Sequence, residues 1–124
     1  MRSIVYTAMS RHSAFAKELV CAHVFHLGSV PLNPFMMFGY FLYDMVDRDQ
    51  VRSANAMVIS AVNEVWSYGP IANGCLQEIL QAQREGKVVR YFNVASRIED
   101  IREIEIDELV FESIELRDAF LASR

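Results

Sequence analysis

Four short apolar runs alternate with helix-like segments over residues 1–94, and this alternation limits the possible folds more than any other feature. The runs occupy residues 3–9, 29–32, 63–69 and 87–94 and are rich in β-branched and aromatic residues. Strands that alternate with helices are typical of a parallel sheet covered by helices on both faces. We therefore predict a single three-layer α/β domain, with a parallel sheet of four or five strands of the flavodoxin-like or Rossmann-like type.

Three segments between these runs have the spacing of amphipathic helices. The first spans residues 13–28 behind a capping Ser10, and its apolar residues recur at Phe15, Leu19, Ala22 and Phe25 or His26. The second begins at Asp47 or Asp49, and its predicted inner face is Val51, Ala54, Met57, Val58 and Ala61. The third spans residues 75–86. Gly28 and Gly86 follow the first and third segments, as is typical of a helix C-terminus.

Two other regions leave alternatives open. Residues 35–45 are rich in methionine and aromatic residues, and they form either core or a subunit interface, or the lid of a base pocket. After Asn93 the sequence turns acidic, and we expect a short strand within residues 101–111 and a final helix over residues 113–124. We assign residues 1–124 to one domain, with an α/β core over 1–94 and an extension over 95–124 that packs on the core or at a subunit interface.

The composition argues against several classes of protein. Hydrophobic residues make up 52% of the chain, which suffices for a core and argues against disorder. The formal net charge of −4 argues against a protein that wraps a nucleic acid polymer, although one nucleotide needs only a helix N-terminus or a single arginine. No apolar run approaches the ~20 residues of a membrane span, and the N-terminus does not resemble a signal peptide. We expect a cytoplasmic protein without a membrane partner, in which Cys21 and Cys75 are reduced.

The common cofactor and metal motifs are absent from the sequence. It contains no phosphate-binding P-loop, no G-x-G-x-x-G and no G-x-S-x-G pattern. His23 and His26 lie three residues apart without a further metal ligand, so we interpret them as histidines on a helix surface. Cys75 begins a helix, where a thiol can be activated, but no histidine has a place beside it and we favour a packing role. We expect neither a metal nor a cofactor.

Glu78 is the strongest candidate for a functional residue because of where it lies. The third apolar run ends in Gly69-Pro70, a short loop with Gly74 follows, and Glu78 falls in the first turns of the next helix. In parallel α/β sheets, ligands bind at the carboxyl ends of the strands, and the loops after the first and second runs reach the same edge. The alternative is a solvated glutamate near a helix N-terminus, where a negative charge is favourable.

The arrangement of these residues resembles the nucleoside 2-deoxyribosyltransferase-like superfamily, and most closely its short, poorly characterised branch. Trp66, Gly69, Gly74 and Glu78 follow the strand-loop-helix pattern of that family in order and spacing, and Tyr6 stands in the N-terminal strand. Residues 86–89, Gly-Lys-Val-Val, resemble its turn into the next strand. The likeness covers roughly residues 3–94.

The resemblance implies a role for each of these residues. Glu78 would be the nucleophile that attacks the anomeric carbon of the sugar, after which the base leaves and another base or water takes the sugar. Tyr6 would orient this carboxylate or line the base pocket. The sugar or a phosphate would lie against residues of the strand-end loops, which are Ala8, Ser10, Gly69, Asn73 and Gly74. A base would be sandwiched by the aromatic-rich segment, at Phe35, Met36 and Phe38.

Two features depart from the pattern of the family. Members with established activity commonly carry an aspartate shortly before the glutamate, whereas residues 70–73 read Pro-Ile-Ala-Asn. Asp44, Asp47 or Asp49 would supply this acid from another segment, or they form a polar cap on the next helix, which is the reading we favour. After the first strand, Ala8-Met9-Ser10 stands in place of the usual Ala-Gly.

We therefore predict a nucleoside or nucleotide N-glycosidase or deoxyribosyltransferase that works through a glutamate nucleophile. The alternative is a catalytically inactive nucleotide-binding protein of the same fold, which would act as a sensor, a sponge or an assembly module. A third reading is a purely structural oligomer without a ligand. The many methionines and phenylalanines of so short a chain also predict a homo-oligomer.

Overall fold

The computed structural model describes residues 2–38 and 45–124. Its strands are β1 (Ile4–Met9), β2 (Val30–Leu32), β3 (Glu64–Tyr68) and β4 (Val88–Phe92). Its α-helices are α1 (Lys17–His26), α2 (Pro34–Met37), α4 (Arg48–Ala61), α5 (Asn73–Arg84) and α6 (Ile114–Ala122). Three 3₁₀ helices complete the described elements, namely η1 (Arg11–Ala16), η2 (Ile98–Asp100) and η3 (Ile106–Glu108).

The four strands form one parallel sheet in the order β2-β1-β3-β4. The central strand β1 pairs with β2 from Ile4 opposite Val30 and with β3 from Val5 opposite Glu64. Chain order reverses between β1 and β3, because the first crossover leads outward to β2 and the second returns to the other side of β1. The predicted three-layer α/β fold with a parallel sheet is confirmed.

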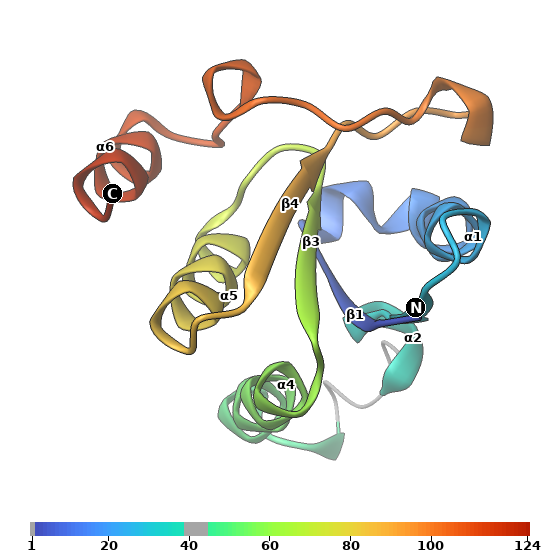
Figure 1. Cartoon of the computed structure of the whole chain (residues 1–124). Helices are drawn as coiled ribbons and strands as arrows, with labels where there is room; N and C mark the ends of the chain where they lie inside the picture. The colour runs from blue at the N-terminus through green and yellow to red at the C-terminus, as the bar shows by residue number, and fades with distance from the viewer. Residues whose placement is uncertain (1, 39–44) are drawn as a thin grey trace.

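Helices cover both faces of this sheet (Figure 1). On one face α1 packs Val20 and Val24 against Val5, Trp66 and Phe92. On the other face, α4 and α5 pack against the strand residues whose side chains point the opposite way. This cluster contains Tyr6, Ala8 and Val65 of the strands with Ile59 and Ala82 of the helices. The period-two alternation of β1 thus sends Tyr6 toward the α4–α5 layer.

The inner faces predicted for two helices are confirmed only in part, since Leu19 packs against the core and Val51 is buried but other predicted residues are exposed. In α1 the buried residues are Val20, His23 and Val24, whereas Phe15, which precedes it in η1, is 74% exposed. In α4 the buried residues are Val51 and Ile59, and Met57 is 75% exposed. Both segments carry more apolar residues than one face can hold, so spacing alone did not identify the stripe that packs.

The acidic tail crosses the end of the sheet instead of adding a strand to it. Ile101 packs in the α1 layer. The apolar residues further along the tail pack in the α5 layer, namely Ile104, Ile106, Leu109 and Phe111. Two isolated bridges, Phe92–Glu103 and Ile71–Phe111, are its only β-type pairings among the described residues. The predicted strand within residues 101–111 is therefore wrong, because the apolar residues of the tail serve two layers in turn. The predicted final helix is present as α6, and its Phe120 is fully buried near α5.

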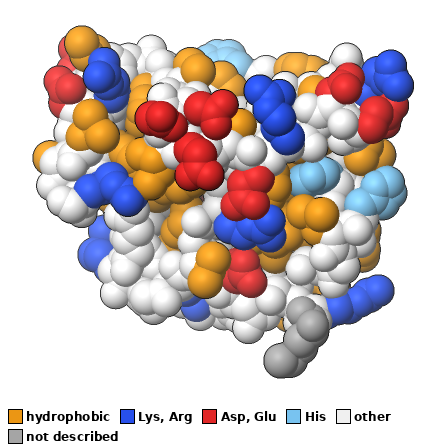
Figure 2. All heavy atoms as spheres, turned by 45° about the horizontal axis from the view of Figure 1, so that its top comes forward, with side chains coloured by type: hydrophobic (Ala, Val, Ile, Leu, Met, Phe, Trp, Pro, Cys, Tyr) orange, Lys and Arg blue, Asp and Glu red, His pale blue; other side chains and the backbone are white. Residues whose placement is uncertain are grey.

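This carboxyl-end face of the molecule carries acidic and basic side chains close together, with hydrophobic ones between them (Figure 2). Within the described ranges, no helix has both the length and the apolar character that crossing a membrane would require.

Candidate functional site

A cavity of about 460 Å³ opens at the carboxyl ends of β1 and β3, where the chain order of the sheet reverses. Parallel α/β sheets bind ligands at such a point because the loops after the two strands leave toward opposite faces. Its walls come from the loops after β1, β2 and β3, from α4 and α5, and from the tail. The residues that line it are Met9, Ser10, Arg11, His12, Pro34, Phe35, Arg48, Val51, Arg52, Asn55, Ala72, Gly74, Cys75, Glu78 and Glu112.

Glu78 and Tyr6 meet beneath this cavity. Tyr6 is fully buried in β1, and its hydroxyl donates a hydrogen bond of 2.5 Å to Oε2 of Glu78, on the second turn of α5. Glu78 lines the cavity and Tyr6 does not, so the tyrosine holds the carboxylate from below. The predicted pair of Tyr6 and Glu78 is thus brought together across 72 residues of sequence.

The environment of Glu78 shifts the pKa of its carboxyl group toward neutral pH. Burial raises its pKa to about 7, and the hydrogen bond from Tyr6 opposes this rise because it stabilises the ionised form. A carboxyl group of this kind exists in both protonation states near pH 7. Perturbed titration inside a cavity is characteristic of groups that transfer protons or attack substrates.

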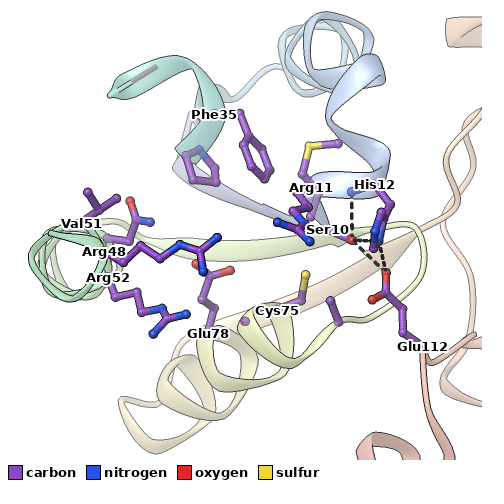
Figure 3. Close-up of a pocket in the computed structure, with 15 residues that line it drawn as sticks. Ser10, Arg11, His12, Phe35, Arg48, Val51, Arg52, Cys75, Glu78 and Glu112 are labelled. Carbon is purple, nitrogen blue, oxygen red and sulfur yellow. Dashed lines mark hydrogen bonds and ion pairs between the residues drawn. The ribbon is translucent and has the colours of Figure 1, made fainter. Parts of the chain in front are cut away.

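A second polar cluster, which joins Ser10, His12 and Glu112, lies across the cavity (Figure 3). The Ser10 hydroxyl donates to Oε2 of Glu112 over 2.8 Å and accepts from the backbone N–H of His12 over 3.1 Å. The same Oε2 lies 3.2 Å from Nδ1 of His12. Burial raises the pKa of Glu112, but the bonds from Ser10 and His12 outweigh it and hold that pKa below its usual range. Since Nδ1 faces Glu112, the other ring nitrogen of His12 is the one available to a ligand.

The tail positions Glu112 by pairing with the loop after β3. The backbone N–H of Ile71 donates to the carbonyl of Val110, and the N–H of Glu112 donates to the carbonyl of Ile71. Ile71 is fully buried in the same cluster as Phe120 of α6. The tail therefore brings a carboxylate beside residues 70–73, the stretch that has none of its own.

Three arginines give the cavity a basic wall. Arg11 begins η1, while Arg48 and Arg52 extend from α4 into the cavity toward Glu78 (Figure 3). Phe35 of α2 lies on the opposite wall with Pro34. The cavity thus combines an aromatic surface, cationic groups and one partly buried carboxylate.

Of the remaining predicted site residues, Ser10, Phe35 and Gly74 line the cavity. Asn73 instead lines a second cavity of about 360 Å³, which shares Arg52, Asn55, Gly74 and Glu78 with the first. Glu78 therefore lies where the two cavities adjoin.

Ala8, Met36 and Gly69 do not line either of these cavities. Ala8 is fully buried in the core between β1 and α4. Met36 is half exposed, and its sulfur lies 3.6 Å from that of Cys21. Gly69 has φ of +78°, and a Cβ there would meet Cγ2 of Val94 at 2.7 Å, so this glycine serves the turn after β3. These three predicted substrate-binding residues therefore lie away from the two cavities.

Asp47 has the capping role that we favoured, whereas Asp49 lies in the first turn of α4. The side chain of Asp47 accepts from the N–H of Asp49 and caps α4, and Asp49 pairs with Arg52 at 3.4 Å. Asp44 lies outside the described residues, as do the predicted core, interface or lid positions 39–43. Of the rest of that segment, Phe35 faces the cavity and Met37 packs near Tyr6 in the core.

Cys75 and His23 both serve packing. Burial raises the pKa of the Cys75 thiol to about 12, which keeps it protonated and agrees with the packing role expected for it. The surface position expected for His23 is wrong: it is buried, its Nδ1 lies 2.8 Å from the Tyr68 hydroxyl, and its ring packs on Phe92. Burial accordingly lowers the pKa of His23.

The sequence comparison places most of the α/β core in one family. Residues 4–92 match the family model described as "Domain of unknown function (DUF7768)". The chain belongs to this family. The DUF7768 match includes Tyr6, the arginines of α4 and Glu78, and it ends before Glu112. No curated protein matches the chain.

Sequence reasoning missed Arg48, Arg52, Asn55, His12 and Glu112 as residues of the cavity. The α4 residues carried a usable signal, since positions 48, 52 and 55 fall on one helical stripe beside Val51, but we considered only the apolar residues of this helix. Glu112 carried no local signal because its position depends on backbone pairing with Ile71, 41 residues earlier in the sequence (112 − 71).

Proposed function

We propose that this chain cleaves the bond between base and sugar in nucleosides or nucleotides, as an N-glycosidase or deoxyribosyltransferase with Glu78 as the nucleophile. The observation that carries the proposal is the buried hydroxyl of Tyr6 bonded to a cavity-lining glutamate at the switch point of a parallel sheet. A solvated helix glutamate does not need a fully buried tyrosine beneath it. The family resemblance of the sequence gives this pair the same roles.

The proposed reaction begins with the ionised form of Glu78. One carboxylate oxygen attacks the anomeric carbon while the C–N bond to the base breaks, and the electron pair of that bond leaves with the base, which takes up a proton. The product is a glycosyl ester on Glu78. Water or a second base then attacks the same carbon and gives up a proton to the group that protonated the first base, while the bond to Glu78 breaks and the carboxylate is released. Which acceptor is used decides between hydrolysis and transfer.

Tyr6 acts in this scheme as a positioning residue. Its hydroxyl bonds one carboxylate oxygen from below, which leaves the other to attack. A hydrogen bond to the charged form also lowers the pKa of Glu78 against the opposing effect of burial, so more nucleophile is present at neutral pH.

Phe35 and Pro34 provide the surface for the base. Both line the cavity on the wall away from α5, and aromatic rings stack well on the flat apolar face of a base. His12 also lines the cavity, and in the proposed reaction its second ring nitrogen donates the proton that the leaving base requires.

Binding without catalysis is the second candidate. The observation in its favour is that residues 70–73 bring no carboxylate to the cavity, although active relatives in the resembling family commonly have one there. Such a protein would bind the same ligands in the same cavity and release them unchanged.

The deciding experiment is to incubate the protein with ribo- and deoxynucleosides and their monophosphates, and to separate free base by chromatography. We expect free base with the wild type and with Glu115→Gln, an exposed glutamate of α6, and none with Glu78→Gln. Equal base release by wild type and Glu78→Gln would contradict the nucleophile. Ligand-induced thermal stabilisation without base release would favour the binding protein.

A further inference from the structure

The arginines of the cavity stand out against the charge of the whole chain. The protein has 16 acidic and 12 basic residues besides histidine, for a formal net charge of −4, yet Arg11, Arg48 and Arg52 all line one cavity. Among the residues that the structure describes, two carboxylates, Glu78 and Glu112, line it with them. A local excess of positive charge in a cavity of an acidic protein favours an anionic ligand.

Neither carboxylate neutralises the arginines of α4. The carboxylate of Glu78 is hydrogen-bonded to Tyr6, and that of Glu112 is hydrogen-bonded to Ser10 and lies beside His12. Arg48 and Arg11 have no ion pair among the residues that the structure describes. Arg52 pairs with Asp49 at 3.4 Å, but both side chains are largely exposed, so this pair is weak and readily exchanged.

Arg48, Arg52 and Asn55 form one polar stripe on α4. Residues three and four apart on a helix lie side by side, so the two guanidinium groups can approach the same anion. Val51, on the same face, is buried and fixes the rotation of the helix. Both arginines extend into the cavity on the side of Glu78 (Figure 3).

Asn55 supplies an independent sign of a missing polar ligand. Its Oδ1 is buried at the cavity and has no hydrogen-bond partner among the described residues. A buried acceptor left without a partner is destabilising, and native proteins rarely tolerate this without a reason. A sugar hydroxyl beside the anion would donate to it.

We propose that Arg48 and Arg52 form a phosphate subsite, so that the preferred ligand is a nucleoside 5′-monophosphate and not the free nucleoside. The inference rests on the proposed function for the nature of the ligand, and it names the part of the ligand that the basic wall holds. The base stacks at Phe35, the sugar lies over Glu78, and the phosphate meets the arginines at the α4 edge. Arginine suits this task because its planar donors bind two phosphate oxygens at once.

Binding is measured in the Glu78→Gln background, so that no ligand is consumed. Isothermal titration with the common deoxynucleosides and their 5′-monophosphates gives the ratio of dissociation constants for each pair. We expect the monophosphate to bind at least about tenfold more tightly, and the double variant Arg48→Gln, Arg52→Gln to reduce this preference to about one. Arg102→Gln, an exposed arginine of the tail, is the matched control and keeps the preference. Arg48→Lys with Arg52→Lys retains part of it.

Three outcomes overturn the subsite. Equal affinity for nucleoside and monophosphate does so, as does a preference that survives in the double glutamine variant, or a failure of every monophosphate to bind. Failure of the glycosidase proposal has a different signature, because the phosphate preference then remains in the titrations while the wild type releases no base from any monophosphate. Circular dichroism melts of each variant exclude loss of folding as the cause of lost binding.

Discussion

Oε2 of Glu112 accepts a 2.8 Å hydrogen bond from the hydroxyl of Ser10, although the two residues are 102 positions apart. Ser10 follows the first strand, and Glu112 belongs to the tail that follows the strands and helices of the α/β core. The bond ties the extension to the mouth of the cavity. The extension is therefore part of the cavity wall and more than a cover for the edge of the sheet.

Glu112→Ala tests this relationship. The change removes the acceptor shared by Ser10 and His12, and we expect base release to fall by about tenfold because His12 loses the group that orients it. Stability should fall by no more than about 1 kcal/mol, since the pair lies near the surface. The control is Glu115→Ala, and unchanged turnover in Glu112→Ala would show that the tail does not serve the reaction.

The α/β core could be predicted from the sequence, because apolar strands and helix ends are local signals. The run from Val5 to Met9 is buried on both faces, and Gly28 and Gly86 follow their helices with φ of +85° and +73°. The Tyr6–Glu78 pair was also predictable, since both residues lie at fixed places in a strand and a helix.

The basic wall and Glu112 were not predicted, and of these only the α4 residues carried a local signal, in their helical spacing. The side of α4 that faces the cavity depends on the packing of Val51 and Ile59, while its exposed Met57 made another face look apolar. The position of Glu112 depends on backbone pairing with Ile71, which leaves no periodic trace in the sequence. Tertiary contacts decided both features.

Glu78→Gln should make the protein more stable at neutral pH. The unfolded chain loses the Glu78 proton near the ordinary pKa of 4.5, whereas the native state keeps it until about pH 7. Between these values the native state binds more protons, so the contribution of Glu78 to stability falls as pH rises through this window. The glutamine variant escapes this loss, which amounts to at most about 3 kcal/mol and less where solvent reaches the group.

The measurement is a series of chemical or thermal unfolding curves of both proteins from pH 4 to pH 8. The variant and the wild type should be similar near pH 4, and the advantage of the variant should grow up to about pH 7 and then level off. A difference that is constant across the series would mean that Glu78 titrates normally.

Tyr6→Phe should move the pH dependence of base release. If ionised Glu78 is the nucleophile, kcat/KM rises with pH through about 7 in the wild type. Removing the hydroxyl removes a bond that lowers the pKa, so the midpoint should move upward by about one to two pH units, as the strength of a hydrogen bond to a charged group implies.

Tyr91→Phe is the matched control for this variant. Tyr91 is also buried on the α5 side of the sheet, but it packs in another cluster with Phe120. The midpoint of the pH dependence of kcat/KM in Tyr91→Phe should equal that of the wild type. An unchanged midpoint in Tyr6→Phe would mean that the tyrosine hydroxyl does not influence the pKa of Glu78.

Two glycines that follow β3 should respond in opposite ways to the same added methyl group. Gly69 has φ of +78°, and its new Cβ would meet Cγ2 of Val94 at 2.7 Å, so Gly69→Ala should lose about 2 kcal/mol or more of stability. Gly74 lies in the first turn of α5, and its Cβ meets no protein atom within 4 Å. Gly74→Ala should therefore gain up to about 1 kcal/mol, because alanine loses less entropy in a helix.

The open space beside Gly74 belongs to both cavities, so the stabilised variant should bind ligands less well. We expect Gly74→Ala to weaken the binding of monophosphates by about 1 kcal/mol, a factor of about five, while its melting temperature rises. Unfolding curves and titrations of the two variants give both quantities. Stability and binding that rise together in Gly74→Ala would mean that the ligand does not approach this turn of α5, and would place it closer to the first strand.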